Sequence, residues 1–221
     1  MKLNDHERKI IEILKKNPFV NQQFIANELS LSRPAVANMI SGLQDKGYIL
    51  GKPYLLRTEK YITCVGGANL DYIFRLEQEL MMKTSNPVIS SKSYGGVIRN
   101  VAENLARLNH KVSLMSVIGD DFAGQDLLEH SRKLMEVFAV DQLPHEKTGG
   151  YYSLINTHGD LDIGFADMSI NHLMNRTWVF NHKRDLILSD WIICDTNVAK
   201  DGLEALIEFS RNESIKLAII G

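Results

Sequence analysis

The feature that most constrains the fold is a change of hydrophobic period after residue 60. Short apolar runs rich in β-branched residues, "YITCVGG", "KVSLMSVIG", "WIICD" and "IKLAIIG", alternate with the amphipathic segments "VIRNVAENLARLN", "AGQDLLEHSRKLM" and "AKDGLEALIEFSRN". The runs are typical of strands buried on both faces, and the segments are typical of helices. We therefore predict an α/β domain over residues 60–221, with a mainly parallel sheet flanked by helices on both faces.

A second group of strands does not fit this alternation. Residues 148–168 predict a β-hairpin that turns at His158-Gly159-Asp160, with no helix to pair it, and residues 87–95 predict another strand. Such strands are expected to form a small sheet set apart from the main one. A lid over a binding site is one use for such a sheet.

The first 57 residues differ in charge and in pattern. They hold nine Lys/Arg and five Asp/Glu, whereas acidic residues outnumber basic ones in the remainder of the chain. The pattern predicts three helices, the first capped by Asn4 and the third by Ser32, and then a hairpin over "YILGKPYLL". This order resembles the winged helix-turn-helix family over about residues 3–57. The resemblance implies a DNA-binding domain at residues 1–57.

The third helix of this domain supplies the candidate DNA contacts. If Val36, Ile40 and Leu43 are buried, the other face of the helix carries polar side chains that can meet base edges and phosphates. Arg33 suits guanine and Asn38 suits adenine, while lysines suit phosphates. The candidates are Ser32, Arg33, Asn38, Ser41, Lys46 and Lys52. A helical protein-interaction module with ordinary solvated charges is the alternative interpretation.

Gly95 and Gly96 stand directly before a predicted helix of the α/β domain. Glycines at a helix start let backbone approach a ligand closely, and the N–H groups of the first turn favour oxygen-rich or anionic groups. Asn100 lies on that turn and offers both a donor and an acceptor, which suits a sugar hydroxyl. A simple tight turn is the alternative, because the spacing matches neither a dinucleotide fingerprint nor a P-loop.

Three stretches in order, "CVGGANLDYIFRL", "YGGVIRNVAENLARL" and "SVIGDDFAGQDLL", resemble the ribokinase-like, or PfkB, carbohydrate kinases. The resemblance runs from about residue 60 to the end of the chain. It implies that Asp71, Gly95, Gly96 and Asn100 hold hydroxyls of a sugar acceptor. An ionised carboxylate accepts from hydroxyls while backbone N–H groups and an amide fill the remaining positions, so the assignment is chemically sensible.

Three further residues are candidates for substrate contact. Thr148 and Tyr151 fall on the predicted lid hairpin, where packing is the alternative role for the tyrosine. Asn197 follows "WIICD", at a carboxyl strand end where ligands of open α/β folds gather, and an ordinary loop asparagine is its alternative reading. We expect no metal site, because the sequence has no CxxC or clustered histidine pattern.

The family resemblance also implies ATP and Mg²⁺ as cofactors and an aspartate base within a late Gly-Ala-Gly-Asp motif. The 221 residues contain no such motif. We therefore expect a piece of a longer kinase whose catalytic aspartate lies beyond Gly221, and which by itself is inactive and binds no cofactor. The pairing with a winged helix resembles bacterial pseudouridine-kinase-like proteins, which makes a nucleoside the leading acceptor. A sugar-sensing transcription regulator with a non-catalytic kinase-like domain is the alternative, and an α/β domain with another small ligand is a third.

Location and assembly follow from general features. No apolar run approaches a membrane span, the N-terminus has no signal-peptide pattern, and Cys64 and Cys194 lie within apolar runs, as reduced buried thiols do. We expect a cytoplasmic protein with no membrane partner. Both resemblances are to families that often dimerise, so a homodimer is expected.

Overall fold

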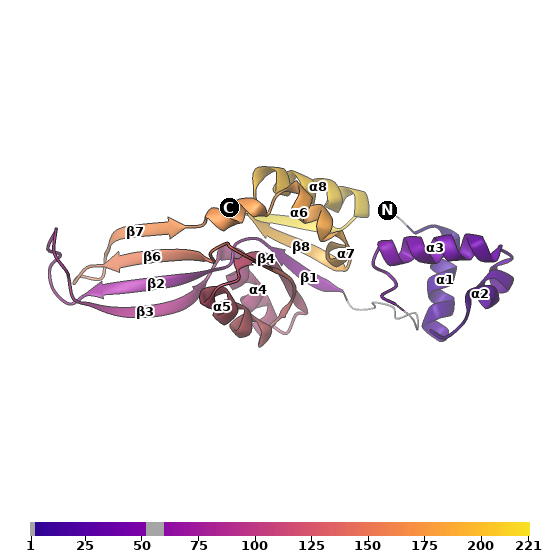
Figure 1. Cartoon of the computed structure of the whole chain (residues 1–221), viewed down its shortest axis with the longest axis horizontal. Coiled ribbons are helices and arrows are strands. Elements are labelled where there is room, and N and C mark those ends of the chain that lie inside the picture. The colour runs from indigo at the N-terminus through magenta and orange to yellow at the C-terminus, as the bar shows by residue number, and fades with distance from the viewer. Residues whose placement is uncertain (1–2, 52–59) are drawn as a thin grey trace.

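The structure, a computed structural model, describes residues 3–51 and 60–221. A three-helix unit is followed by an α/β part, and a second, smaller sheet extends from the α/β part (Figure 1). The predicted fold class is therefore confirmed. The proposed boundary between residues 57 and 60 falls beside the stretch 52–59, which lies outside the described residues.

The three-helix unit consists of α1 (Asp5–Lys16), α2 (Gln22–Leu29) and α3 (Arg33–Asp45). The predicted caps are present, because the Asn4 side chain accepts from the Glu7 N–H and the Ser32 side chain accepts from the Ala35 N–H. One apolar core joins the helices; it contains Ile10, Leu14, Ile25, Ala26, Val36, Ile40, Leu43 and Ile49. Most of the predicted hairpin, Lys52 included, lies outside the described residues.

The main sheet is parallel, with the strand order β5-β4-β1-β8-β9. Its strands are β1 (Tyr61–Val65), β4 (Val112–Gly119), β5 (Glu136–Leu143), β8 (Ser189–Asp195) and β9 (Lys216–Ile220). Every residue of β4 is buried, as the near-continuous apolar run predicts. The strand β5 was not predicted from the sequence.

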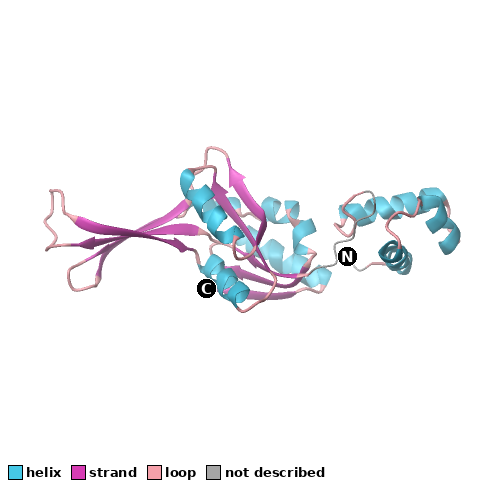
Figure 2. Ribbon diagram, turned by 90° about the horizontal axis from the view of Figure 1, so that it is seen from below, coloured by secondary structure: helices cyan, strands magenta, loops and turns pink. Residues whose placement is uncertain are grey.

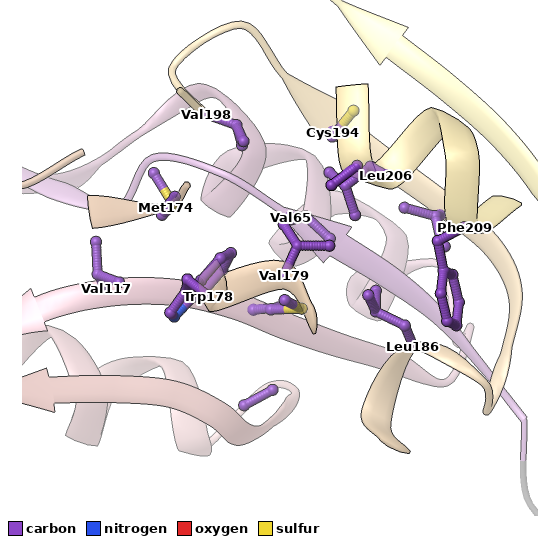
Figure 3. Packing of buried hydrophobic residues seen from close by; sticks show 14 of the residues in the cluster. Val65, Val117, Met174, Trp178, Val179, Leu186, Cys194, Val198, Leu206 and Phe209 are labelled. Atoms are coloured by element: carbon purple, nitrogen blue, oxygen red, sulfur yellow. The ribbon is translucent and has the colours of Figure 1, made fainter. Parts of the chain in front are cut away.

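Helices cover both faces of this sheet (Figure 2). One face packs against α4 (Val97–Arg107) and α5 (Phe122–Arg132). The other packs against the short helix η1 (Ser169–Leu173), α6 (Arg176–Asn181), α7 (Lys183–Leu186) and α8 (Lys200–Glu213). Figure 3 shows the core on this second face, where Val65, Cys194 and Leu206 converge from three elements. Alternate residues of each strand therefore serve opposite cores.

The second sheet has the order β3-β2-β6-β7 and contains the strands that were predicted to form a lid; we call it the lid. Its strands are β2 (Asn69–Leu76), β3 (Val88–Gly95), β6 (Gly149–Ile155) and β7 (Leu161–Asp167). Figure 2 shows it extending from the α/β part as a twisted ribbon of strands. The hairpin and the strand at 88–95 agree with the prediction, and Gly159 at the turn has a φ of +93°. The strand β2 was not predicted, so Asp71 lies within a lid strand rather than in a loop.

Helix α6 is joined to the edge strand β5 by a small polar cluster. Trp178 Nε1 donates to Asp141 Oδ2 at 2.8 Å, and His182 Nε2 lies 3.4 Å from Asp141 Oδ1. Burial opposes the charge on His182, but the bond to Asp141 and the Trp178 carbonyl outweigh it and raise the pKa of His182. The bond from His182 lowers the pKa of Asp141. The charged pair therefore stabilises the folded chain where both groups are ionised.

His182→Gln is expected to cost more stability in weakly acidic than in basic solution. A raised histidine pKa gives a contribution that is complete below the unfolded value of 6.5 and is lost as pH rises through the folded pKa. Urea unfolding at about pH 5.5 and about pH 9 measures the difference. His110→Gln, at an exposed position, is the control. A loss that is the same at both pH values would show that the ion pair contributes nothing.

Candidate functional site

Two glycine pairs meet where the main sheet joins the lid. Gly66 and Gly67 follow β1, and Gly95 and Gly96 lead from β3 into α4. Gly96 has a φ of +98°, and a Cβ there would overlap the Gly67 carbonyl oxygen and the backbone of Ala68. The glycines therefore serve first to bring two backbone segments into contact. Such a contact brings the start of α4 directly against the end of β1.

Asp195, the last residue of β8, joins three segments at this place. It is 1% exposed, and its carboxylate accepts from the backbone N–H of Gly67 at 3.3 Å and of Ile98 at 3.1 Å. It also accepts from the backbone N–H and the side-chain amide of Asn197, at 3.1 and 3.0 Å. Sequence reasoning missed Asp195. The available signal was an acidic residue at the carboxyl end of a fully apolar strand.

The bond from Ile98 corrects one expectation about the helix start. Asn100 and Gly95-Gly96 were expected to leave the first N–H groups of α4 free for a ligand. The Ile98 N–H is instead taken by Asp195, which acts as a capping carboxylate supplied from another strand. Asn100 itself is exposed, and its backbone N–H donates to the Gly96 carbonyl. The Ile98 N–H is therefore not available to a ligand, whereas the side chain of Asn100 is exposed.

Asp71 lies at the root of the lid and is half-buried. Asn69 Nδ2 donates to Asp71 Oδ1 at 2.7 Å, which leaves the other carboxylate oxygen without a partner among the described residues. A Cβ at Gly95 would overlap the Asp71 carboxylate. Burial raises the pKa of Asp71, while the bond from Asn69 and the charge of Arg99 oppose that rise. The absence of a side chain at position 95 therefore creates the space that Asp71 occupies.

Tyr151 lies beside Asp71, because the two residues are register partners on the parallel strands β2 and β6. Its hydroxyl lies over Gly164 of β7, so a Cβ at position 164 would overlap this hydroxyl. Thr148 is placed differently. Its hydroxyl donates to Asp121 Oδ1 at 2.6 Å and accepts from the Gly119 N–H at 3.0 Å. The structure thus gives Thr148 a role in holding the turn that Asp121 caps before α5.

The predicted acceptor residues form one connected group, with Thr148 apart from it. Asn197 is exposed and packs against Gly67, Gly67 contacts Gly96, and Gly95 contacts Asp71. Asn100 is joined to the same group through Arg99, whose Nη2 donates to Asn100 Oδ1 at 3.0 Å. The group lies at the carboxyl ends of β1 and β8, where open α/β folds bind ligands. It offers carboxylate, amide and hydroxyl groups, which suit a polyhydroxylated ligand.

The predicted DNA contacts on and around α3 fall into four cases. Arg33, Asn38 and Ser41 are exposed, as a base-reading face requires. Ser32 caps the helix and is exposed beside Arg33. Lys46 Nζ lies 2.6 Å from Glu7 Oε1, and this ion pair competes with the predicted phosphate contact. Lys52 lies outside the described residues.

The described part of the chain contains no group of three or more His, Cys, Asp or Glu residues arranged to hold a metal ion. Cys64 and Cys194 are buried free thiols, and burial raises the pKa of each to about 12. At neutral pH they are therefore protonated and behave as small apolar side chains. Among the helices at 3–51 and 60–221, none is long and apolar enough to cross a membrane.

Comparison with known proteins identifies both parts of the chain. Residues 59–219 match the model of the pfkB family carbohydrate kinases, and residues 3–49 match that of winged helix-turn-helix DNA-binding domains. The first match covers most of the chain, so the chain belongs to the pfkB family of carbohydrate kinases. It carries a winged helix-turn-helix domain at its N-terminus. The two resemblances noted in the sequence are confirmed.

Individual relatives extend this result. An uncharacterized sugar kinase of Escherichia coli K12, YeiI, is 35% identical over 206 residues, covering 91% of this chain and 56% of the relative. A pseudouridine kinase of the same organism is 30% identical over 160 residues, covering 71% and 50%. A carbohydrate kinase from Agrobacterium tumefaciens of known structure shares 30% identity with a TM-score of 0.66, covering 73% and 53%. The chain spans about half the length of the curated relatives it matches.

Asp195→Asn is expected to lower the free energy of unfolding by about 3 kcal/mol. The substituted amide points an NH₂ group at N–H donors and leaves one of them unpaired in a buried position. Asp190→Asn is the matched control, since Asp190 lies on the same strand in an exposed ion pair with Lys60, and should change stability by less than about 0.5 kcal/mol. Urea unfolding of both variants measures the difference. Equal stability of the two variants would contradict the role assigned to Asp195.

Proposed function

We propose that this chain provides the acceptor-binding part of a kinase that transfers a phosphoryl group from ATP to a hydroxyl of a sugar or nucleoside, with pseudouridine the leading acceptor. Membership of the pfkB family supports the reaction class, and the 30% identity to a pseudouridine kinase supports the acceptor. One observation carries the proposal: a half-buried carboxylate, Asp71, stands at the lid root with one oxygen held by Asn69. Its second oxygen is available to accept from a ligand hydroxyl.

The proposed roles follow from the positions of the side chains. Asp71 accepts from a hydroxyl, and Asn100 fills an adjoining position on α4. Gly95 and Gly96 contribute a backbone that approaches the acceptor closely. Tyr151 is the register partner of Asp71 on β6, and its hydroxyl lies over Gly164 of β7. Two predicted contacts, Thr148 and Asn197, stay proposals, and both have side chains already hydrogen-bonded within the chain.

The chemical step requires groups that these residues do not supply. A ribokinase of Arabidopsis thaliana with the same fold is known in complex with ribose and ATP, and we propose ATP and Mg²⁺ as the cofactors of the whole protein. In such a reaction a metal ion neutralises phosphate charge. The described residues hold no metal-binding cluster, so nothing here is assigned to Mg²⁺. We propose that the 221 residues alone do not catalyse phosphoryl transfer, since they lack the Gly-Ala-Gly-Asp motif. ATP-dependent phosphorylation of pseudouridine by this chain would refute that.

Asp71→Asn and Asn100→Ala should each weaken pseudouridine binding about tenfold or more. The first variant removes the carboxylate that accepts from a ligand hydroxyl, and the second removes the amide that hydrogen-bonds to the ligand. Titration calorimetry on the protein expressed from its complete reading frame is the test. Arg75→Gln is the control, since Arg75 lies on the same strand as Asp71 but is exposed further along the lid. Affinity that stays unchanged in both site variants would remove these residues from the acceptor site.

We propose that the N-terminal domain binds DNA, with Arg33, Asn38 and Ser41 facing the bases. Their exposure on α3 supports the proposal. Arg33→Ala should weaken binding to a duplex that the wild-type protein selects from a random pool, by about tenfold. Lys200→Ala, an exposed cation on α8, is the control. A wild-type protein without any salt-dependent DNA affinity would refute DNA binding altogether.

We also propose a cytoplasmic homodimer that pairs through the lids. The two buried free thiols suit a reducing compartment. On the lid, Tyr152, Ile163 and Phe165 are 37%, 37% and 61% exposed and lie on neighbouring strands, as a covered apolar face would. Light scattering should give twice the monomer mass for the wild type, and Phe165→Ser should shift it toward the monomer. A monomeric wild type would refute pairing.

A further inference from the structure

Arg99 is a buried guanidinium at the start of α4. It is 3% exposed, and its Nη2 donates to Asn100 Oδ1 at 3.0 Å and to Glu103 Oε2 at 2.5 Å. Its Nε and Nη1 have no hydrogen-bond partner within the described residues. Its centre lies 5.9 Å from the middle of the Tyr94 ring. A buried guanidinium with unpaired donors is costly to stability, because the chain does not replace the hydrogen bonds that those donors make to water.

The contact with Asn100 determines which way that side-chain amide points. A guanidinium has only donors, so the Asn100 atom that faces it must be the carbonyl oxygen. The NH₂ group of Asn100 is then the end that points away from Arg99. Asn100 is exposed, so this NH₂ group is the one available to a ligand. The neighbour of Asn100 thus decides that it acts as a donor.

Arg99 also acts on the other polar group of the site. Burial raises the pKa of Asp71, and the hydrogen bond from Asn69 and then the charge of Arg99 oppose that rise. No direct bond joins Arg99 to Asp71 in the described structure. Glu103, one turn further along α4, holds Nη2 of Arg99 and keeps the guanidinium at the helix. Because Arg99 makes no bond to Asp71, Oδ2 of Asp71 stays available to a ligand, while the charge of Arg99 favours the ionised form of the carboxyl group.

We propose that Arg99 is a positioning residue of the acceptor site: it holds Asn100 with its NH₂ group toward the ligand, as a donor. Its charge at the same time favours the ionised, accepting form of Asp71. The ligand chemistry is that of a sugar or nucleoside hydroxyl, and in that respect the inference rests on the proposed function. Arg99 touches neither the ligand nor the reacting atoms in this role. It acts through Asn100 and Asp71.

The chain offers a matched control in Arg107. Its guanidinium donates to Glu103 Oε1 through Nε at 2.9 Å and through Nη2 at 2.6 Å, and its side chain is 60% exposed. Arg107→Gln removes a guanidinium from the carboxylate that also binds Arg99, but leaves Asn100 untouched. Arg99→Met removes every donor and keeps an apolar stem of similar length. Arg99→Lys keeps a positive donor and tests rescue.

The first measurement needs no ligand and uses the 221-residue chain. NMR follows the chemical shift of the Asp71 carboxyl carbon through a pH titration. It also records the signal of the Asn100 side-chain amide, which is identified by its loss in Asn100→Ala. Arg99→Met should shift the Asn100 signal and raise the titration midpoint of Asp71, because the opposing cation is gone. Arg99→Lys should restore most of both, and Arg107→Gln should change neither. If Arg99→Met leaves both signals at their wild-type values, the proposal is overturned.

The second measurement is titration calorimetry with pseudouridine and ribose on the protein from the complete reading frame. Arg99→Met should weaken pseudouridine binding about tenfold, and Arg107→Gln should change it less than about twofold. Wild-type affinity in Arg99→Met would overturn the positioning role. If the wild type binds neither compound, the proposed function fails, and the NMR measurement still decides whether Arg99 orients Asn100 and acts on Asp71.

Discussion

The carboxylate of Asp195 accepts hydrogen bonds from the loop after β1, from the first turn of α4 and from Asn197. These three segments are far apart in the sequence, and each contributes a residue to the candidate site. Gly96 reinforces the same junction, since its missing Cβ allows β1 and α4 to touch. A buried carboxylate with this many N–H partners is well satisfied, and an amide or apolar side chain in its place leaves donors unpaired. The rest of the site is built around this junction.

From this junction the polar groups of the site divide into two classes. Asp195 and Arg99 are buried and bind other residues of the chain, while Asp71 and Asn100 keep hydrogen-bonding capacity for a ligand. The lid brings Tyr151 next to Asp71 through strand register. The same chain carries a winged helix-turn-helix domain, so a pfkB-family kinase part and a DNA-binding type of domain are joined in one polypeptide. The arrangement is chemically suited to bind a ligand hydroxyl.

Much of the fold could be predicted from local patterns. Buried strands such as β4 show as apolar runs, and the caps at Asn4, Ser32 and Asp121 follow from residue type and spacing. The strand β2 could not be recognised, because it follows a glycine pair at once and its half-buried residues show no clear alternation. Nor could Asp195 or Arg99 be assigned to the site. Their roles depend on which strands and helices become neighbours, and that is a property of tertiary structure rather than of local sequence.

Hydrogen exchange of the Gly67 and Ile98 backbone amides, followed by NMR in the unmodified chain, tests the central claim most directly. If Asp195 holds the junction as described, both amides should exchange at least about a thousandfold more slowly than in an unfolded chain, although Gly67 lies in a loop and Ile98 lies in a first helical turn. Exchange near the unfolded rate at both positions would contradict the account. It would mean that the acceptor site is not assembled around the Asp195 carboxylate.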